Sequence, residues 1–229
     1  MILSHSHRFI FIKTRKTAGT SIEVFLSQHC GPEDVFTPID PPLPQHQPRN
    51  FRGLWNPLPE LQKNGWGASW PRIWQDLVQR RKFYNHIPAR VAQQRMAPGL
   101  WQNYLSFCVE RNPWDKTLSH YAMVNQRLGG NMSLDDYFDY GLFCTDFDKY
   151  TDAAGRLLVT AVLRYENLQQ ELTQIFGQLG IPFDGNLGVR AKSDYRKDRR
   201  PYQAVYTPAQ RDFVARHFAR EIALFGYQF

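Results

Sequence analysis

Lys16, Thr20 and Ser21 stand close together in a segment whose residue types suit the binding of an oxyanion. The apolar run Phe9–Ile12 precedes them and predicts a short buried strand. The sequence Thr20-Ser21-Ile22-Glu23 has the pattern of a capping box, which predicts the start of a helix. Amides at a helix N-terminus point outward with the positive end of the helix dipole. We therefore expect this loop to hold a phosphate or a similar oxyanion.

The loop differs from the Walker A motif of many nucleotide-binding proteins. That motif places a lysine and a hydroxyl residue directly after its last glycine, whereas here Lys16 precedes Gly19. The lysine and hydroxyl arrangement that holds a magnesium nucleotide is therefore absent from the sequence, and no metal is expected.

A second segment suited to anions follows the apolar run Leu105–Val109, which predicts another strand. Asn112 is a good helix N-cap, and Pro113 suits the first helical position. Arg111 and Ser119 would then lie near the carboxyl end of the strand and on the adjoining helix. The sequence thus contains two successive units of strand, polar loop and helix.

Strands alternate with helices along the rest of the chain. The first helix is expected from Ser21 to about Gln28, a third strand at Leu157–Leu163, and a last helix from about Pro208 to Phe225. This alternation predicts an α/β fold, a three-layer sandwich with a central and mainly parallel sheet. The ligand crevice of such a sheet lies at the carboxyl ends of its strands, where both polar loops fall.

Composition is consistent with one domain spanning residues 1–229. The net charge of +7 favours anionic partners, and the densest basic cluster runs from Arg190 to Arg200. That cluster could cover a nucleotide, bind an anionic acceptor or be solvated surface. Three cysteines without metal-ligand or redox spacing indicate a reducing compartment. No apolar run approaches the roughly 20 residues that span a bilayer, so we expect a cytoplasmic protein without membrane insertion.

The segment at about 37–82 has a different composition, because prolines and tryptophans are frequent and periodicity is weak. A long irregular segment within a compact domain is usually functional or disordered, and the tryptophans argue against disorder. We expect an irregular insertion that covers a cleft and forms part of the acceptor site.

The two polar segments resemble motifs of sulfotransferases that use 3'-phosphoadenosine 5'-phosphosulfate (PAPS), above all the carbohydrate-type and bacterial branches. Lys16-Thr17-Ala18-Gly19-Thr20-Ser21 resembles the 5'-phosphosulfate loop of that family. Val109-Glu110-Arg111-Asn112-Pro113-Trp114, followed by Leu118-Ser119-His120-Tyr121, resembles its 3'-phosphate strand and helix. Arg164-Tyr165-Glu166-Asn167-Leu168 is similar to a recurrent strand end of the family, and Phe225-Gly226-Tyr227-Gln228-Phe229 to its closing residues.

The resemblance implies a fold like that of the P-loop kinases and transfer of a sulfuryl group from PAPS to a hydroxyl. The acceptor would be a carbohydrate or another small metabolite, and the product of the donor adenosine 3',5'-bisphosphate. Lys16 is implied to lie at the 5'-phosphate and the bridging oxygen, where negative charge grows as the bond breaks. Arg111 and Ser119 are implied to bind the 3'-phosphate. The other donor-binding residues implied are Arg15, Thr17, Ala18, Gly19, Thr20 and Ser21.

His86 is the expected catalytic base, because similar bacterial sequences carry a histidine between the insertion and the arginine strand. A base with a pKa near neutral suits removal of the acceptor's proton. Glu23, Glu110 and His120 are the alternatives, and Glu110 could instead be the partner of Arg111. The role of Arg15 stays open between the donor, the acceptor and a structural ion pair.

Two other functions remain alternatives. A nucleoside or sugar kinase would need a lysine after the glycine and a magnesium carboxylate, neither of which is evident in the sequence. A non-catalytic module that binds anionic glycans or nucleotides would keep both loops without a working base. No aromatic and basic nucleic-acid motif is recognisable, so no nucleic-acid partner is expected.

Overall fold

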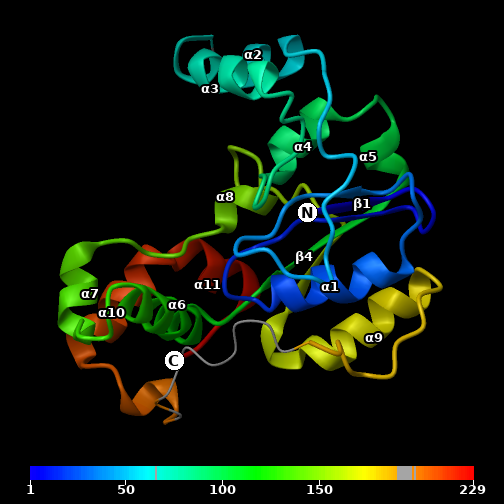
Figure 1. Cartoon of the computed structure of the whole chain (residues 1–229). Helices are drawn as coiled ribbons and strands as arrows, with labels where there is room; N and C mark the ends of the chain where they lie inside the picture. Colours follow the sequence, from blue (N-terminus) through cyan, green and yellow to red (C-terminus); the bar gives the residue numbers. More distant parts are fainter. Residues whose placement is uncertain (65, 190–197, 199) are drawn as a thin grey trace.

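The fold was obtained as a computed structural model, which describes residues 1–64, 66–189, 198 and 200–229 (Figure 1). Nearly all of the basic cluster from Arg190 to Arg200 lies outside the described residues. The roles considered for that cluster therefore stay predictions.

A central sheet of five strands organises the molecule, in the order β3-β1-β2-β4-β5. Strands β2, β4 and β5 are parallel neighbours, and β1 runs antiparallel to both β2 and β3. Four of the five strands therefore share one direction, and the predicted α/β class with a mainly parallel sheet is confirmed. The strands are β1 Ile2–Ser4, β2 Phe9–Phe11, β3 Val35–Phe36, β4 Leu105–Glu110 and β5 Ala161–Arg164.

Both faces of the sheet are covered, because successive side chains of a strand point to opposite faces. Ile10 of β2 and Cys108 of β4 belong to one buried cluster, together with residues of α4, α5 and α8. Phe11 and Phe107 are cross-strand partners with ring centroids 5.1 Å apart, and they belong to a second cluster with α1 and α9. The sheet is thus the middle layer of three (Figure 1).

Eleven α-helices are present in the described part of the chain. A third cluster joins α6, α7, α10 and α11 beside the sheet. The helices are α1 Gly19–His29, α2 Leu58–Asn64, α3 Trp66–Val78, α4 Ala89–Arg95, α5 Leu100–Asn103, α6 Pro113–Arg127, α7 Leu134–Tyr140, α8 Phe147–Tyr150, α9 Leu168–Gln178, α10 Pro208–His217 and α11 Ala219–Phe225.

The predicted capping box at the start of α1 is wrong. Ala18 is the N-cap, in a left-handed conformation and without a side-chain cap hydrogen bond. Glu23 is fully buried, and instead of reaching back to Thr20 it accepts a hydrogen bond of 2.6 Å from Lys13 Nζ and another from the Met1 amino group. Glu23 therefore forms ion pairs with Lys13 and the Met1 amino group instead of capping the helix.

The segment 37–82 is also less irregular than expected, because α2 and α3 occupy most of its second half. In Figure 1 these two helices lie at the top, away from the sheet. Arg95 of α4 is buried and holds both helices, with bonds of 2.9 and 3.1 Å to Glu60 and of 2.8 Å to Asp76. These ion pairs join residues that are far apart in the sequence. The local composition of the segment therefore did not predict the two helices.

Two further boundaries differ from the prediction. The third strand begins at Ala161 instead of Leu157. The last predicted helix is divided at Phe218, which ends α10 and precedes α11. The short strands β1 and β3 were not predicted.

Candidate active site

A cavity of about 1000 Å³ lies where the loops after β2 and β4 meet. Its lining includes the loop before α1, the start of α6 and the segment before α4. All the site residues expected from the sequence therefore lie at one cavity. They are Arg15, Lys16, Thr17, Ala18, Gly19, Thr20, Ser21, His86, Arg111 and Ser119.

The loop between β2 and α1 is held against β4. Thr14 Oγ1 donates to the carbonyl oxygen of Val109 at 2.5 Å and lies 2.8 Å from Thr17 Oγ1. Lys16 and Ala18 both have left-handed backbones, with φ of 63° and 58°. A side chain at Gly19 would bring its Cβ to 2.8 Å from Lys13 Cγ, so the close turn requires glycine. These contacts and the close turn at Gly19 fix the conformation of the loop.

The first turn of α1 presents amides to the cavity. Gly19, Thr20 and Ser21 begin the helix and line the cavity wall. The first amides of a helix have no acceptor within the helix, and the Ala18 cap supplies no side-chain acceptor. Because the helix has 11 residues, its dipole adds positive potential at this end. This geometry suits an oxyanion.

Arg111 connects the two loops. Its Nη1 donates to the carbonyl oxygen of Lys16 at 3.0 Å, while Nε and Nη2 donate to Asp115 Oδ2 at 2.9 and 2.6 Å. The guanidinium carbon lies 4.1 Å from the centroid of the Tyr165 ring. The guanidinium is therefore fixed in position at the cavity by an ion pair, a backbone carbonyl and an aromatic face.

The start of α6 agrees with the prediction. The side chain of Asn112 accepts a hydrogen bond of 3.1 Å from the amide of Trp114, and Pro113 occupies the first helical position. Ser119 lies one turn beyond Asp115 on the same helix and also lines the cavity.

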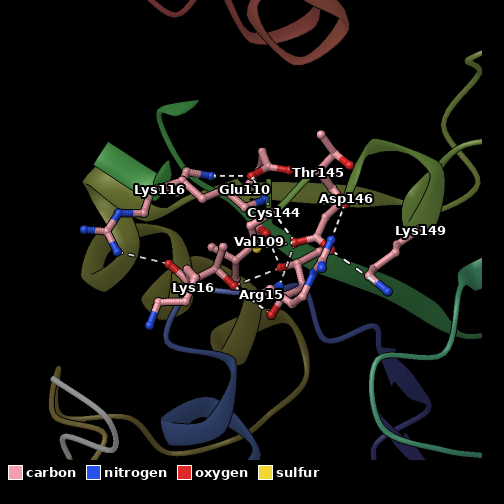
Figure 2. Close-up of polar contacts among 12 residues, drawn as sticks. Arg15, Lys16, Val109, Glu110, Lys116, Cys144, Thr145, Asp146 and Lys149 are labelled. Atoms are coloured by element: carbon pink, nitrogen blue, oxygen red, sulfur yellow. Dashed lines mark hydrogen bonds and ion pairs between the residues drawn. The ribbon is translucent and has the colours of Figure 1, made fainter. Parts of the chain in front are cut away.

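A network of ion pairs around Asp146 connects the loop before α1 with the end of β4 and with α6 (Figure 2). Asp146 lies between Lys116, at 3.0 Å, and Arg15, whose Nε donates to it at 2.9 Å. Lys116 also contacts Glu110 at 2.7 Å. Burial alone would raise the pKa of Asp146, but the cations of Lys116, Arg15 and Lys149 outweigh it and lower the pKa to about 2. The carboxylate is thus ionised at neutral pH.

This network bears on Arg15, whose role the sequence left open. The backbone amide of Arg15 donates to Asp146 at 2.8 Å, and its Nη2 donates to the Thr145 carbonyl oxygen at 2.5 Å. These contacts give Arg15 the geometry of a structural ion pair at the cavity wall. Sequence reasoning missed Asp146, because the residue follows α7 and has no motif around it.

His86 lies at the cavity with a left-handed backbone, φ 57°. Its Nδ1 is 3.0 Å from the carbonyl oxygen of Lys13. A carbonyl oxygen can only accept, so Nδ1 carries the proton and Nε2 the lone pair. Burial, and next the Lys13 ammonium, lower the pKa to about 4. The pKa expected near neutral is therefore corrected downward, and the imidazole is neutral at physiological pH.

The alternative bases differ in their surroundings. Glu23 is wrong as a candidate because it is buried against Lys13 and the Met1 amino group. Glu110 is wrong for a similar reason, since it is buried and accepts from Lys116 Nζ and from the backbone amide of Arg111. The ion-pair partner of the Arg111 guanidinium is Asp115 and not Glu110. His120 does line the cavity, with its Nδ1 2.8 Å from the Tyr137 hydroxyl.

The charged residues of the cavity wall are mostly cations. They are Lys13, Arg15, Lys16, Arg111 and Arg127, against the carboxylates of Asp40, Asp115 and Glu166. Asp40 is the lining residue that comes from the insertion, among its described residues. The described residues contain no group of three or more His, Cys, Asp or Glu placed to hold a metal ion. Within the same residues, none of the helices has the length and apolar character needed to cross a bilayer.

No family model matches the chain. An uncharacterized protein of Archaeoglobus fulgidus is 29% identical over 118 residues, which cover 48% of this chain and 98% of that protein. A sulfotransferase structure from Alicyclobacillus acidocaldarius is 18% identical with a TM-score of 0.43, and the match covers 97% of this chain and 96% of that one.

Proposed function

We propose that this protein is a sulfotransferase that moves the sulfuryl group of PAPS to a hydroxyl of a carbohydrate or another small metabolite. The observation that carries the proposal is the hydrogen bond between Arg111 and the Lys16 carbonyl, which joins two anion-suited loops at one cavity. A ligand with anionic groups at two positions fits two such loops better than a ligand with one.

The residues present fit a nucleotide with a 5'-phosphosulfate and a 3'-phosphate. Lys16, Thr20 and Ser21 at the start of α1 would hold the 5' end, and Arg111 with Ser119 the 3'-phosphate. Three of the five N–H groups of Arg111 are used in the bonds to Lys16 and Asp115, which leaves two to donate to a phosphate. The apolar lining residues offer a surface for a flat base; they are Leu168, Leu172, Phe183, Leu187 and Val189.

The donor, when bound, supplies an activated sulfuryl group. The protein then has to neutralise the charge that grows on the leaving phosphate and align the attacking hydroxyl. Lys16 and the first amides of α1 provide positive charge and N–H donors for that phosphate. Because the loop is held by Thr14, Arg111 and the turn at Gly19, these donors need little reorganisation.

His86 would take the proton of the acceptor hydroxyl at Nε2. The Lys13 carbonyl holds the Nδ1 proton, so the ring keeps one orientation and the imidazolium that forms stays hydrogen-bonded. A pKa of about 4 makes a free imidazole a weak base. A bound anion close to the ring raises that pKa, because an opposite charge favours the protonated form.

The test is transfer of ³⁵S from labelled PAPS to a panel of glycans and small hydroxylated metabolites, with binding of adenosine 3',5'-bisphosphate measured by calorimetry. Labelled product that disappears in Lys16→Ala supports the proposal. Bisphosphate binding without transfer to any acceptor would favour the non-catalytic module. Transfer of phosphate from ATP to a nucleoside or sugar would favour the kinase and overturn the proposal.

A further inference from the structure

The arm formed by α2, α3 and the four residues that follow, 58–64 and 66–82, carries apolar side chains that are exposed on one side of α3. Trp70, Trp74 and Val78 are 41%, 56% and 66% exposed. They are spaced by four residues on α3 and therefore follow one side of that helix. The rings of Trp70 and Trp74 contact each other, with centroids 5.8 Å apart.

Buried contacts fix which side of α3 faces outward. Ile73 and Asp76 are buried on the inner side of the helix. Asp76 accepts from Arg95 at 2.8 Å and from Arg81 Nε at 2.7 Å. A helix held by a buried ion pair cannot turn its tryptophans inward without breaking that pair, which is costly. The exposed aromatic face is thus a fixed feature of the surface.

The exposed charges of the arm are of one sign, although Arg72 stacks on Tyr84 and Arg81 is paired with Asp76. Glu60 and Asp76 are the acidic residues of the segment 58–82, and both are buried with Arg95. The exposed charged side chains of the arm are basic: Lys63, Arg72 and Arg80, with Arg81 and Lys82 half-buried beside them. The surface of the arm therefore combines exposed tryptophan with positive charge.

We propose that the arm docks on the surface of an anionic phospholipid bilayer, with Trp70 and Trp74 at the level of the headgroups. Tryptophan favours the boundary between headgroups and acyl chains, and lysine and arginine add attraction to anionic lipid. A helix with an apolar side and flanking cations lies in the plane of such an interface. This docking is peripheral and does not depend on which reaction the cavity performs.

The test is flotation of the full chain with two kinds of vesicle, phosphatidylcholine alone and phosphatidylcholine mixed with phosphatidylglycerol. We expect binding to the mixed vesicles that weakens as salt is added. The double variant Trp70→Ala/Trp74→Ala should bind roughly tenfold more weakly, because the anchoring rings are lost. A matched control is Leu128→Ala/Leu142→Ala, which removes side chains that are 56% and 57% exposed elsewhere on the surface.

A second pair of variants tests the contribution of the basic residues of the arm to vesicle binding. Lys63→Gln/Arg80→Gln should weaken binding to the mixed vesicles, whereas Arg156→Gln/Arg216→Gln should weaken it less, although the net charge changes equally. Circular dichroism and Tm establish that each variant is folded. Absence of vesicle binding by the wild type would overturn the proposal, as would equal binding by the arm and control variants. A dimer that dissociates in Trp74→Ala would assign the face to a second copy of the chain and would also overturn it.

Discussion

The guanidinium of Arg111 lies 3.0 Å from the carbonyl oxygen of Lys16, although 95 residues separate the two in the sequence. The same guanidinium is paired with Asp115 and stacked on Tyr165. One side chain therefore fixes the relative position of the two loops at which a two-phosphate ligand would bind.

Replacing Arg111 by alanine should weaken binding of adenosine 3',5'-bisphosphate by about 2 kcal/mol, or roughly thirtyfold, because the charged hydrogen bond proposed between Arg111 and the 3'-phosphate is lost. A nucleotide lacking the 3'-phosphate should lose much less. Calorimetric titration of both ligands measures the difference. Arg211→Ala is a control, since that arginine is exposed and pairs with its neighbour Asp212. Equal weakening of both nucleotides would contradict the assignment.

His86→Ala should abolish sulfate transfer while the bisphosphate still binds, because the role proposed for the imidazole is at the acceptor and not at the nucleotide. Transfer of ³⁵S and calorimetry give the two measurements. His120→Ala is the matched control, as this second histidine also lines the cavity and is bonded to Tyr137. Near-normal turnover in His86→Ala would contradict the assignment of His86 as the base. A loss of turnover found only in His120→Ala would assign that role to His120.

The pH profile of kcat/KM for the proposed sulfate transfer should reflect the low pKa of His86. Since the imidazole loses its proton above about pH 4, kcat/KM should stay level from pH 8 to about pH 5. If the base were a histidine with an unperturbed pKa, kcat/KM would already fall below about pH 6.5. The folded pKa is below the unfolded value, so the stability that His86 contributes is present above pH 6.5 and is lost as the pH falls through about 4. Activity should be measured where unfolding curves show a native protein.

Asp146→Asn should destabilise the fold by about 3 kcal/mol, because Lys116 and Arg15 lose a buried anion. Denaturant unfolding at several pH values measures this. The fold lowers the pKa of Asp146 to about 2. The variant's loss in free energy of unfolding should therefore be complete above pH 3.8 and shrink as the pH falls through about 2. Asp148→Asn is the control: its pair with Arg220 is exposed, and its loss should leave stability nearly unchanged. Equal effects of the two variants would refute the role given to the buried network.

Substitutions at two adjacent residues of the loop should change the stability of the protein in opposite directions. Gly19→Ala places a Cβ 2.8 Å from Lys13 Cγ and should cost roughly 1 to 3 kcal/mol of stability together with ligand affinity. Ala18→Gly relieves a left-handed alanine with φ 58° and should raise stability by about 0.5 to 1 kcal/mol. Thermal unfolding of both variants provides the comparison. Destabilisation by Ala18→Gly would show that the loop conformation carries no strain.

Local patterns were sufficient for the parts of the site that depend on neighbours in sequence. The apolar runs before Lys16 and Arg111 predicted parallel strands, and parallel strands bring their carboxyl ends together. The cap at Asn112 was predicted for the same reason, since capping needs only the next few residues. The residues chosen from these patterns all line the cavity.

The errors come from partners distant in sequence. Glu23 has the spacing of a capping residue but is bound by Lys13 and the Met1 amino group. Asp146 has no motif, and only the folded chain brings it to Arg15 and Lys116. The strand β3 has two residues, too few for a periodic pattern. Buried ion pairs between remote elements leave no local signal in a single sequence.

The position of β2 in the sheet has a consequence for the order of folding. Ile2 of β1 pairs with Phe11, nine positions away (11 − 2 = 9), whereas Phe9 pairs with Leu105 of β4, 96 positions away (105 − 9 = 96). The β1–β2 hairpin can close quickly, while the parallel pair must first close a long loop. We therefore expect the loop before α1 to meet Arg111 only after that slower step, late in folding, even though the strand before the loop belongs to a local hairpin.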